Sequence, residues 1–358
     1  MKKIIVVILI ILILCGGGYF TWSYLDENFR DYVPIAEESV SSGESVYFVG
    51  DYYVKHNAYV INAYKITPTE PVPVSVLSVA GNYEFKAATT DYIVFFSEGT
   101  ISIFAETQGV FARVGVIDGT LITARQYGER LYLKCDIGGS IMHYLFDRST
   151  TSFEDVTNQR GFTFSDWFCS DDGTKEFYMC YSTSNGVIKL TIRVFKNGIE
   201  QAALEFDNVI YYNLRHVNGL LILESARDIL FISETTYVRR TLRYYDTTLL
   251  TCFEGENGVL YYAPEGYFDS KNNMVFVNSE DMLFYKFENS LPMTLHGADP
   301  LYAEGNSVYR FSLSSRLFET AKLLTVENEV KGIGVMKNGI IAVVTENNVV
   351  FMYKESLR

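Results

Sequence analysis

Three aspartates that lie close together are the nearest approach to a chemical site in this sequence. Asp166, Asp171 and Asp172 fall within seven residues, and a calcium ion takes about six to eight oxygen ligands, many of them from carboxylates. The D-x-D-x-D-G spacing of a calcium loop is absent, so a solvated turn is the simpler interpretation. We therefore expect no metal ligand and no cofactor site in the chain.

The motifs of the common enzyme classes are also missing. There is no phosphate-binding loop, no dinucleotide glycine fingerprint, no HExxH and no nucleophile elbow. Gly138, Gly139 and Ser140 come nearest to a phosphate cradle, but a hairpin turn explains them. Glu254 and Glu256 are most simply solubilising charges near a turn. Two carboxylates could hydrolyse a glycan only at a suitable separation, which the sequence does not supply, so we name no catalytic residue.

The cysteines outside the N-terminal region form no metal pattern. Cys135, Cys169, Cys180 and Cys252 have spacings that match no zinc motif. Cys169 and Cys180 flank a turn and could face each other across a hairpin, which leaves a disulfide open. Buried free thiols that act as small apolar side chains are the simpler interpretation.

The N-terminal region predicts a membrane anchor. Lys2 and Lys3 precede 19 residues without a charge, 4–22, which span about 28 Å as a helix, close to the thickness of a bilayer core. Because lysines favour the cytoplasmic side, residues 1–3 are expected in the cytoplasm and 4–22 as a transmembrane signal-anchor. The rest of the chain would then lie outside the cytoplasm, in the periplasm or on the cell surface, as a single-pass membrane protein.

Two other interpretations of this segment stay open. Cys15 could be lipidated, although Leu14 is larger than the residue that usually precedes a lipidated cysteine. Gly16 and Gly18 could flank a signal-peptide cleavage site, although the aromatic residues that follow are better explained as an anchor at the membrane surface. All three interpretations export the same domain.

Beyond the anchor, the pattern indicates an all-β protein. Residues 23–44 are polar and acidic and are expected to form a juxtamembrane stalk, with a β-propeller ectodomain at 45–358. The chain contains 27 Tyr and 25 Phe, and aromatic residues favour strands. Apolar and polar residues alternate through 188–194, as in a strand with one buried face, and no helical stripe follows residue 45.

Turns recur at a regular distance along the chain. Eight short apolar strands each follow a turn, and successive turns are 34 to 48 residues apart, with a mean of about 42. Repeats of about 40 residues with three or four strands are typical of a β-propeller. Asn-Gly turns suit this pattern because both residues tolerate a positive φ. The residues assigned to these structural turns are Gly128, Asp172, Gly173, Asn218, Gly219, Asn257, Gly258, Asn338 and Gly339; Gly43, Asp91 and Gly305 complete the series.

One of these turns resembles a known repeat. In the segment 168–178, Ser170, Asp172 and Gly173 match the S-P-D-G turn of WD40-like and TolB-like propellers, with Asp171 where proline is usual. The resemblance implies a propeller architecture without a specific family, because no Trp-Asp pair closes a repeat. It also implies that Asp172 caps the turn and has no catalytic role. Seven blades are favoured and eight remain open.

Composition restricts the partners. The formal charge of −13 and the pI near 4.9 argue against nucleic acid, which needs a basic surface. We expect a binding or assembly platform for an envelope or membrane protein, with contact to the membrane only through the N-terminal helix. The alternative is an exported hydrolase of glycans or other small polar substrates with carboxylates at the mouth of the propeller.

Overall fold

The computed structural model describes residues 32–70, 72–170, 173–234, 236, 238–245, 250–255, 258–268, 271–286, 291–296, 299–311 and 320–354. The regular elements in this part of the chain are β-strands. None of the described residues belongs to a helix long and apolar enough to cross a membrane. The expected transmembrane segment 4–22 and Cys15 lie outside the described residues, so the anchor stays a prediction.

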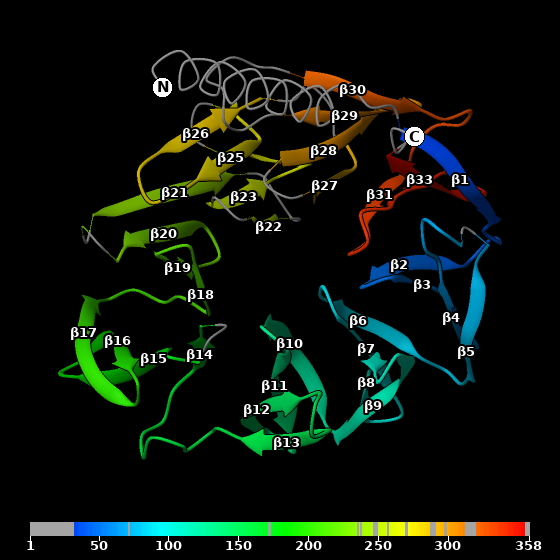
Figure 1. Cartoon of the computed structure of the whole chain (residues 1–358). Coiled ribbons are helices and arrows are strands. Elements are labelled where there is room, and N and C mark those ends of the chain that lie inside the picture. Colours follow the sequence, from blue (N-terminus) through cyan, green and yellow to red (C-terminus); the bar gives the residue numbers. More distant parts are fainter. Residues whose placement is uncertain are drawn as a thin grey trace, which may run out of the picture.

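The strands form eight antiparallel sheets arranged around a ring (Figure 1). In each sheet the first strand lies nearest the centre of the ring, and the last lies at the rim. Blades 1 to 4 use consecutive strands. Blade 1 contains β2 (Ser45–Val49), β3 (Tyr52–Asn57), β4 (Val60–Lys65) and β5 (Val74–Ala80), and blade 2 contains β6 (Glu84–Ala88), β7 (Tyr92–Ser97), β8 (Thr100–Thr107) and β9 (Val110–Asp118). Blade 3 contains β10 (Thr120–Tyr127), β11 (Arg130–Ile137), β12 (Ser140–Asp147) and β13 (Ser152–Asp155), and blade 4 contains β14 (Asp166–Cys169), β15 (Lys175–Ser184), β16 (Val187–Lys196) and β17 (Ile199–Asp207).

The second half of the ring departs from this pattern in two places, at the rim of blade 5 and at the closure of blade 8. Blade 5 contains β18 (Asn213–Val217), β19 (Leu220–Glu224), β20 (Asp228–Ser233) and β21 (Arg239–Tyr245), with β24 (Tyr267–Phe268) added at its rim. Blade 6 contains β22 (Thr251–Gly255), β23 (Gly258–Tyr262), β25 (Met274–Val277) and β26 (Met282–Tyr285). Blade 7 contains β27 (Met293–His296), β28 (Asp299–Glu304), β29 (Ser307–Phe311) and β30 (Thr320–Thr325), and blade 8 contains β31 (Gly332–Val335), β32 (Ile341–Val344), β33 (Asn348–Lys354) and β1 (Tyr32–Ser39).

The ring therefore has eight blades, and the preference for seven was wrong. The C-terminal part of the chain supplies three strands of blade 8, and β1 supplies the fourth by pairing antiparallel with β33. This pairing joins the two ends of the propeller, as Figure 1 shows at β1 and β33. It completes an additional blade, whereas the preference for seven assumed that the first and last repeats would share one.

The closing strand also corrects the expected start of the propeller. Tyr32–Ser39 lies inside 23–44, which was expected to be a stalk, and forms the outermost strand of blade 8. The acidic composition fits a rim strand, because only one of its edges is paired. Pro34 is tolerated there because proline is confined to edge strands and bulges, and the register shifts between Pro34 and Ala36.

Antiparallel pairing gives the ring two faces. The turns between the first and second strands of each blade, and between the third and fourth, lie on one face, which we call the first face. The turns between the second and third strands and the connections between blades lie on the opposite, second face. The first residue of β1, Tyr32, pairs with Lys354 at the end of β33. The third strand of a blade ends on the first face, so β1 begins there.

Apolar side chains fill the space between blades. All five residues of β19 are buried, and the strand has no polar face because a neighbouring blade covers each side of the sheet. Clusters of apolar residues join neighbouring blades, such as the cluster that contains Ile222 of blade 5 and Tyr261 of blade 6. The double burial explains why these strands are apolar on both sides in the sequence.

Most of the residues assigned to turns have left-handed backbone conformations. Gly128, Gly173, Asn218, Gly219 and Gly339 have φ values between 49° and 83°, a region that favours glycine and asparagine. Gly258 has φ of 157°, and a Cβ there would collide with the carbonyl oxygen of Val277. Asn338 starts the Asn-Gly turn between β31 and β32 and donates from Nδ2 to the Ile66 carbonyl at 2.9 Å. Asp172 and Asn257 lie outside the described residues.

The contact between blades 8 and 1 depends on Gly334. A Cβ at this buried position in β31 would overlap the ring of Phe48 in β2. We expect Gly334→Ala to lower the free energy of unfolding by about 1–3 kcal/mol, as overpacking of a filled core does. The measurement is urea denaturation of the full chain.

Gly332 in the same strand provides the control for this prediction. A Cβ there would lie 3.6 Å from the Cβ of Val344, which is ordinary contact, so Gly332→Ala should change stability by less than about 1 kcal/mol. Adding Phe48→Leu to Gly334→Ala should recover part of the loss. Equal effects at the two glycines would contradict the steric explanation.

Candidate functional site

A buried ion pair joins the inner strands of blades 3 and 4. Arg125 of β10 is 8% exposed and Asp166 of β14 is fully buried, and their Nη2 and Oδ2 atoms are 2.8 Å apart. The Leu214 backbone N–H donates to the same carboxylate oxygen at 2.8 Å, and the Tyr132 hydroxyl donates to the other at 3.1 Å. The protein therefore satisfies both oxygens of Asp166, which is neither a calcium ligand in this structure nor part of a solvated turn.

The guanidinium of Arg125 extends the contact into blade 5. Its Nη1 donates to the Leu214 carbonyl at 2.8 Å, and its Nη2 donates to Asn213 Oδ1. Burial works against the charged guanidinium, but Asp166, Tyr127 and Tyr132 together outweigh it, so the pKa of Arg125 lies above its usual value. The guanidinium is therefore charged at physiological pH.

Polar contacts continue from blade 5 to blade 6. Asn213 donates from Nδ2 to Glu224 Oε2, and Tyr261 donates to Glu224 Oε1 at 2.7 Å. Arg215 lies between two carboxylates, with Nε 3.3 Å from Glu224 and Nη1 2.9 Å from Glu254. The Nε of Arg215 is not aligned for a hydrogen bond, so its contact with Glu224 depends on charge, whereas its Nη1 donates a hydrogen bond to Glu254 Oε1.

This end of the network lies beside a cleft on the second face. The cleft has a volume of about 550 Å³, and we call it the tyrosine cleft. Tyr212, which is 55% exposed, and Tyr244 both donate to the Ser225 carbonyl, at 2.8 and 2.7 Å. These two bonds fix the tyrosine rings in place. The described residues that line the cleft are Tyr212, Arg215, Glu224, Ala226, Tyr244, Leu250, Thr251, Cys252 and Tyr261.

The groups at the base of the tyrosine cleft are not arranged for catalysis. Both oxygens of Glu224 already accept hydrogen bonds from the protein, and Arg215 separates it from Glu254. A glycosidase needs one carboxyl group that can donate a proton and a second that can attack or activate water. Burial raises the pKa of the Cys252 thiol to about 12, so it is not a nucleophile at neutral pH. Of the two glutamates considered in the sequence, Glu256 lies outside the described residues.

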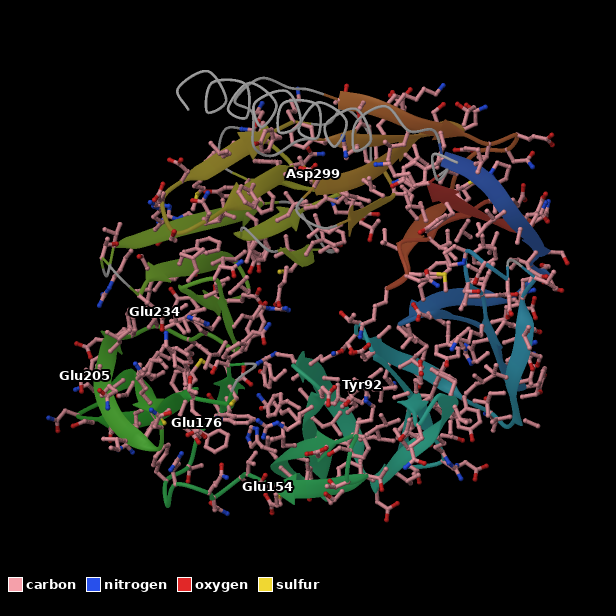
Figure 2. The ribbon with its side chains drawn as sticks, in the orientation of Figure 1. Tyr92, Glu154, Glu176, Glu205, Glu234 and Asp299 are labelled. Atoms are coloured by element: carbon pink, nitrogen blue, oxygen red, sulfur yellow. The ribbon has the colours of Figure 1, made fainter. Side chains whose placement is uncertain are left out.

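A second cleft opens on the first face, and we call it the acidic cleft. Its volume is about 570 Å³, and it spans the turns of blades 8, 1, 2 and 3. Tyr92 of blade 2 donates to the Glu129 carbonyl of blade 3 beside it, and Figure 2 labels Tyr92 near the inner part of these blades. The charged residues that line this cleft are Asp51, Asp91, Glu106, Glu129, Arg148 and Lys337.

A further polar contact on the first face joins blades 4 and 5. Glu234 (Figure 2) lies 2.9 Å from Lys175 of blade 4 and 3.2 Å from His216 of its own blade. The adjacent imidazole of His216 and then the hydrogen bond from Lys175 lower the pKa of Glu234 to about 2. The carboxylate is therefore charged through the physiological range.

The described cysteines and acidic residues form neither a disulfide nor a metal site. Cys169 and Cys180 are not joined by a disulfide, because Cys169 lies opposite Glu176 in the ladder and Cys180 lies opposite Thr191. Burial raises the pKa values of Cys135 and Cys180 to about 12 and about 11. No group of three or more His, Cys, Asp or Glu among the described residues is placed to hold a metal ion.

Most residues of this buried polar network were not singled out from the sequence. Arg125, Asn213 and Glu224 were not singled out, and Asp166 was placed in a different cluster. The available signal was a charged residue at a position where an inner strand is otherwise apolar, as in Arg125 of "TLITARQY". The partners of Arg125 lie 41 to 89 residues away in the chain, so spacing alone could not connect them.

Comparison with known proteins supports the fold and gives no family. Neither a protein-family model nor a curated protein sequence matches the chain. Among solved structures, the Dos1 propeller is similar with a TM-score of 0.50 and 10% identity, over 90% of this chain and 95% of that chain. Sqt1 of Saccharomyces cerevisiae is similar with a TM-score of 0.50 and 9% identity, over 92% of this chain and 100% of that chain. The propeller architecture expected from the WD40-like turn is confirmed, and identities this low establish only the fold.

Proposed function

We propose that this chain is a membrane-anchored, extracytoplasmic propeller that serves as a binding platform for another envelope or membrane protein. The tyrosine cleft carries the proposal. Tyrosine gives a large contact area at low entropic cost, and Tyr212 presents more than half of its surface to solvent. The carboxylates beneath it are already bonded to the protein's own groups. The cleft is therefore suited to contact with a partner and poorly suited to hydrolysis.

The position of the predicted anchor agrees with this use of the second face. Only nine residues, 23–31, separate the predicted transmembrane segment from β1. Because β1 begins on the first face, a short connection would hold that face toward the membrane. The tyrosine cleft would then point away from the membrane, where a partner can reach it.

Site-specific photo-crosslinking in the native membrane tests the proposal. A photoreactive phenylalanine at Tyr212 should capture one recurrent protein, identified by mass spectrometry, from cells that make the full chain. Tyr59 is 80% exposed on the second face of blade 1 and is the matched control position. We expect no recurrent partner from position 59, and Tyr212→Ala should weaken co-purification of the partner by about tenfold, as loss of a central interface tyrosine does.

Two results would contradict the platform role. The platform role would be wrong if no protein were captured from position 212. It would also be wrong if positions 212 and 59 captured the same proteins. The mass spectra of the same sample also report the N-terminal peptide. An intact peptide supports the signal-anchor, a lipid on Cys15 supports lipidation, and an N-terminus after Gly16 or Gly18 supports cleavage.

A further inference from the structure

The acidic cleft holds more negative than positive groups. Four carboxylates and two cations line it. Its cations are already engaged, since Lys337 lies 3.2 Å from Asp91 and Arg148 lies 3.7 Å from Glu129. Asp91 also accepts a hydrogen bond from Gln126 at 2.8 Å. The cations of the cleft therefore balance only two of its carboxylates.

The other two carboxylates lack a counter-charge. Asp51 and Glu106 form no ion pair with any described residue, and the Oδ1 atom of Asp51 is buried without a hydrogen-bond partner. A buried acceptor without a donor is costly and is uncommon in native structures. A donor from outside the chain would remove this cost.

The hydroxyl of Tyr52 is a second, independent sign of an absent ligand. Tyr52 is 1% exposed and lines the acidic cleft, yet its hydroxyl has no aligned hydrogen-bond partner. Burial raises the pKa of Tyr52, and the Glu106 carboxylate, which the hydroxyl faces without good hydrogen-bond alignment, and then the charge of Asp51 raise it further. An uncharged hydroxyl and two carboxylates therefore converge on one end of the cleft.

The chemistry of these groups selects an organic cation. The carboxylates of the cleft are not grouped closely enough to hold a metal ion, but spaced acceptors suit the N–H groups of a guanidinium or ammonium. Lys337 shows that an ammonium fits, because its own amine lies on Asp91.

We infer that the acidic cleft binds the guanidinium or ammonium of an arginine or lysine side chain in a basic segment of the partner protein that lies near the membrane, on the face of the ring opposite the tyrosine cleft. The inference rests on the proposed function only for the source of the cation. Asp51 and Glu106 pair with it, and the Tyr52 hydroxyl accepts one of its N–H groups. The overall charge of −13 adds a long-range attraction that guides a basic segment to this face.

Titration of the full-length protein in detergent with fluorescein-labelled nona-arginine tests the inference. Fluorescence anisotropy should show binding that weakens in high salt, which screens exposed charges. The double variant Asp51→Asn/Glu106→Gln should lower the affinity about ten- to hundredfold, the effect of losing hydrogen bonds to a charged group. The two substitutions preserve side-chain shape, and an unchanged melting temperature would show that the fold is intact.

The matched control removes the same charge elsewhere. Glu154 and Glu205 lie on rim strands, away from the acidic cleft (Figure 2), and Glu154→Gln/Glu205→Gln should change the affinity by less than about twofold, as exposed charges do. Equal losses in the two double variants would overturn the inference, because binding would then follow net charge alone. Absence of binding would overturn it as well.

A second probe distinguishes the source of the cation. Agmatine carries a guanidinium and an amine without a peptide, and it should bind far more weakly than nona-arginine. Equal affinity for agmatine would overturn a protein side chain as the ligand. The crosslink at position 212 reports separately on the platform role: a partner recovered without cation binding defeats only this inference, and cation binding without a partner defeats only the proposed function.

Discussion

Replacing Asp166 by asparagine is expected to lower the free energy of unfolding by about 3–5 kcal/mol, the usual cost of breaking a buried ion pair. The substitution keeps the shape of the side chain and removes its charge. Arg125 would then be a cation 8% exposed without its counter-ion. The measurement is urea denaturation followed by the fluorescence of Trp167, which is 2% exposed and whose carbonyl lies 3.5 Å from Arg125 Nη1.

Two further variants separate charge from packing. Adding Arg125→Met to Asp166→Asn removes the uncompensated cation, so the double variant should recover more than half of the loss. Glu205→Gln breaks the exposed pair with Lys189, whose atoms are 2.7 Å apart, and should change stability by less than about 1 kcal/mol. A loss below about 1 kcal/mol for Asp166→Asn would show that the pair does not hold blades 3 and 4 together.

The sequence predicted the architecture because turn chemistry repeats. Six of the eight residues in the series mark the reversal between the first and second strands of their blades. Five lie between the two strands, Asp91, Gly128, Gly173, Gly219 and Gly339, and Gly258 is the first residue of β23. Gly43 and Gly305 belong to other connections, since Gly43 precedes β2 and Gly305 lies between β28 and β29. The corresponding connections are at Gly50, between β2 and β3, and between β27 and β28.

The ring closure could not be predicted in the same way. β1 contains a proline and ends in three acidic or hydroxyl residues. Its pairing partner β33 lies more than 300 residues away, as in the bond from Asn348 to Glu37. A local pattern cannot report such a contact, and an acidic rim strand looks like a linker in sequence.

The buried network escaped prediction for a related reason. A charged residue in a sequence is normally exposed, and burial of Asp166 is favourable only because three donors from blades 3 and 5 converge on it. Those donors come from Arg125, Tyr132 and the Leu214 backbone, and no spacing rule links them. Only the three-dimensional ring shows that the aspartate belongs with them and not with Asp171 and Asp172.

The same network gives the protein a specific sensitivity to acid through His143. This side chain is 1% exposed, and its Nδ1 is 2.7 Å from the Tyr132 hydroxyl. Because that hydroxyl gives its one hydrogen to Asp166, Nδ1 must carry a proton and donate to the hydroxyl oxygen. Burial, and then repulsion from Lys134, lower the pKa of His143 to about 4, whereas Asp166 raises it by less.

In the folded protein His143 therefore stays neutral at a pH where the same side chain in the unfolded chain, with a pKa of about 6.5, is protonated. Above that pH both states are neutral, and below about pH 4 both are protonated. As the pH falls through this window, unfolding takes up one proton, and stability drops by roughly 3 kcal/mol in total. The loss lies at higher pH than the loss expected from Glu234, whose carboxylate is lowered to a pKa of about 2.

His143→Asn isolates this effect from the carboxylates that titrate in the same range. Asparagine can donate from Nδ2 to the Tyr132 hydroxyl and has no charged form, so its network does not change with pH. The variant should be less stable than the natural chain at pH 7, and the difference should shrink by roughly 3 kcal/mol when urea denaturation is repeated down to pH 4. A difference that stays constant with pH would show that the pKa of His143 is the same in the folded and unfolded states, so that burial in the network does not disfavour its protonation.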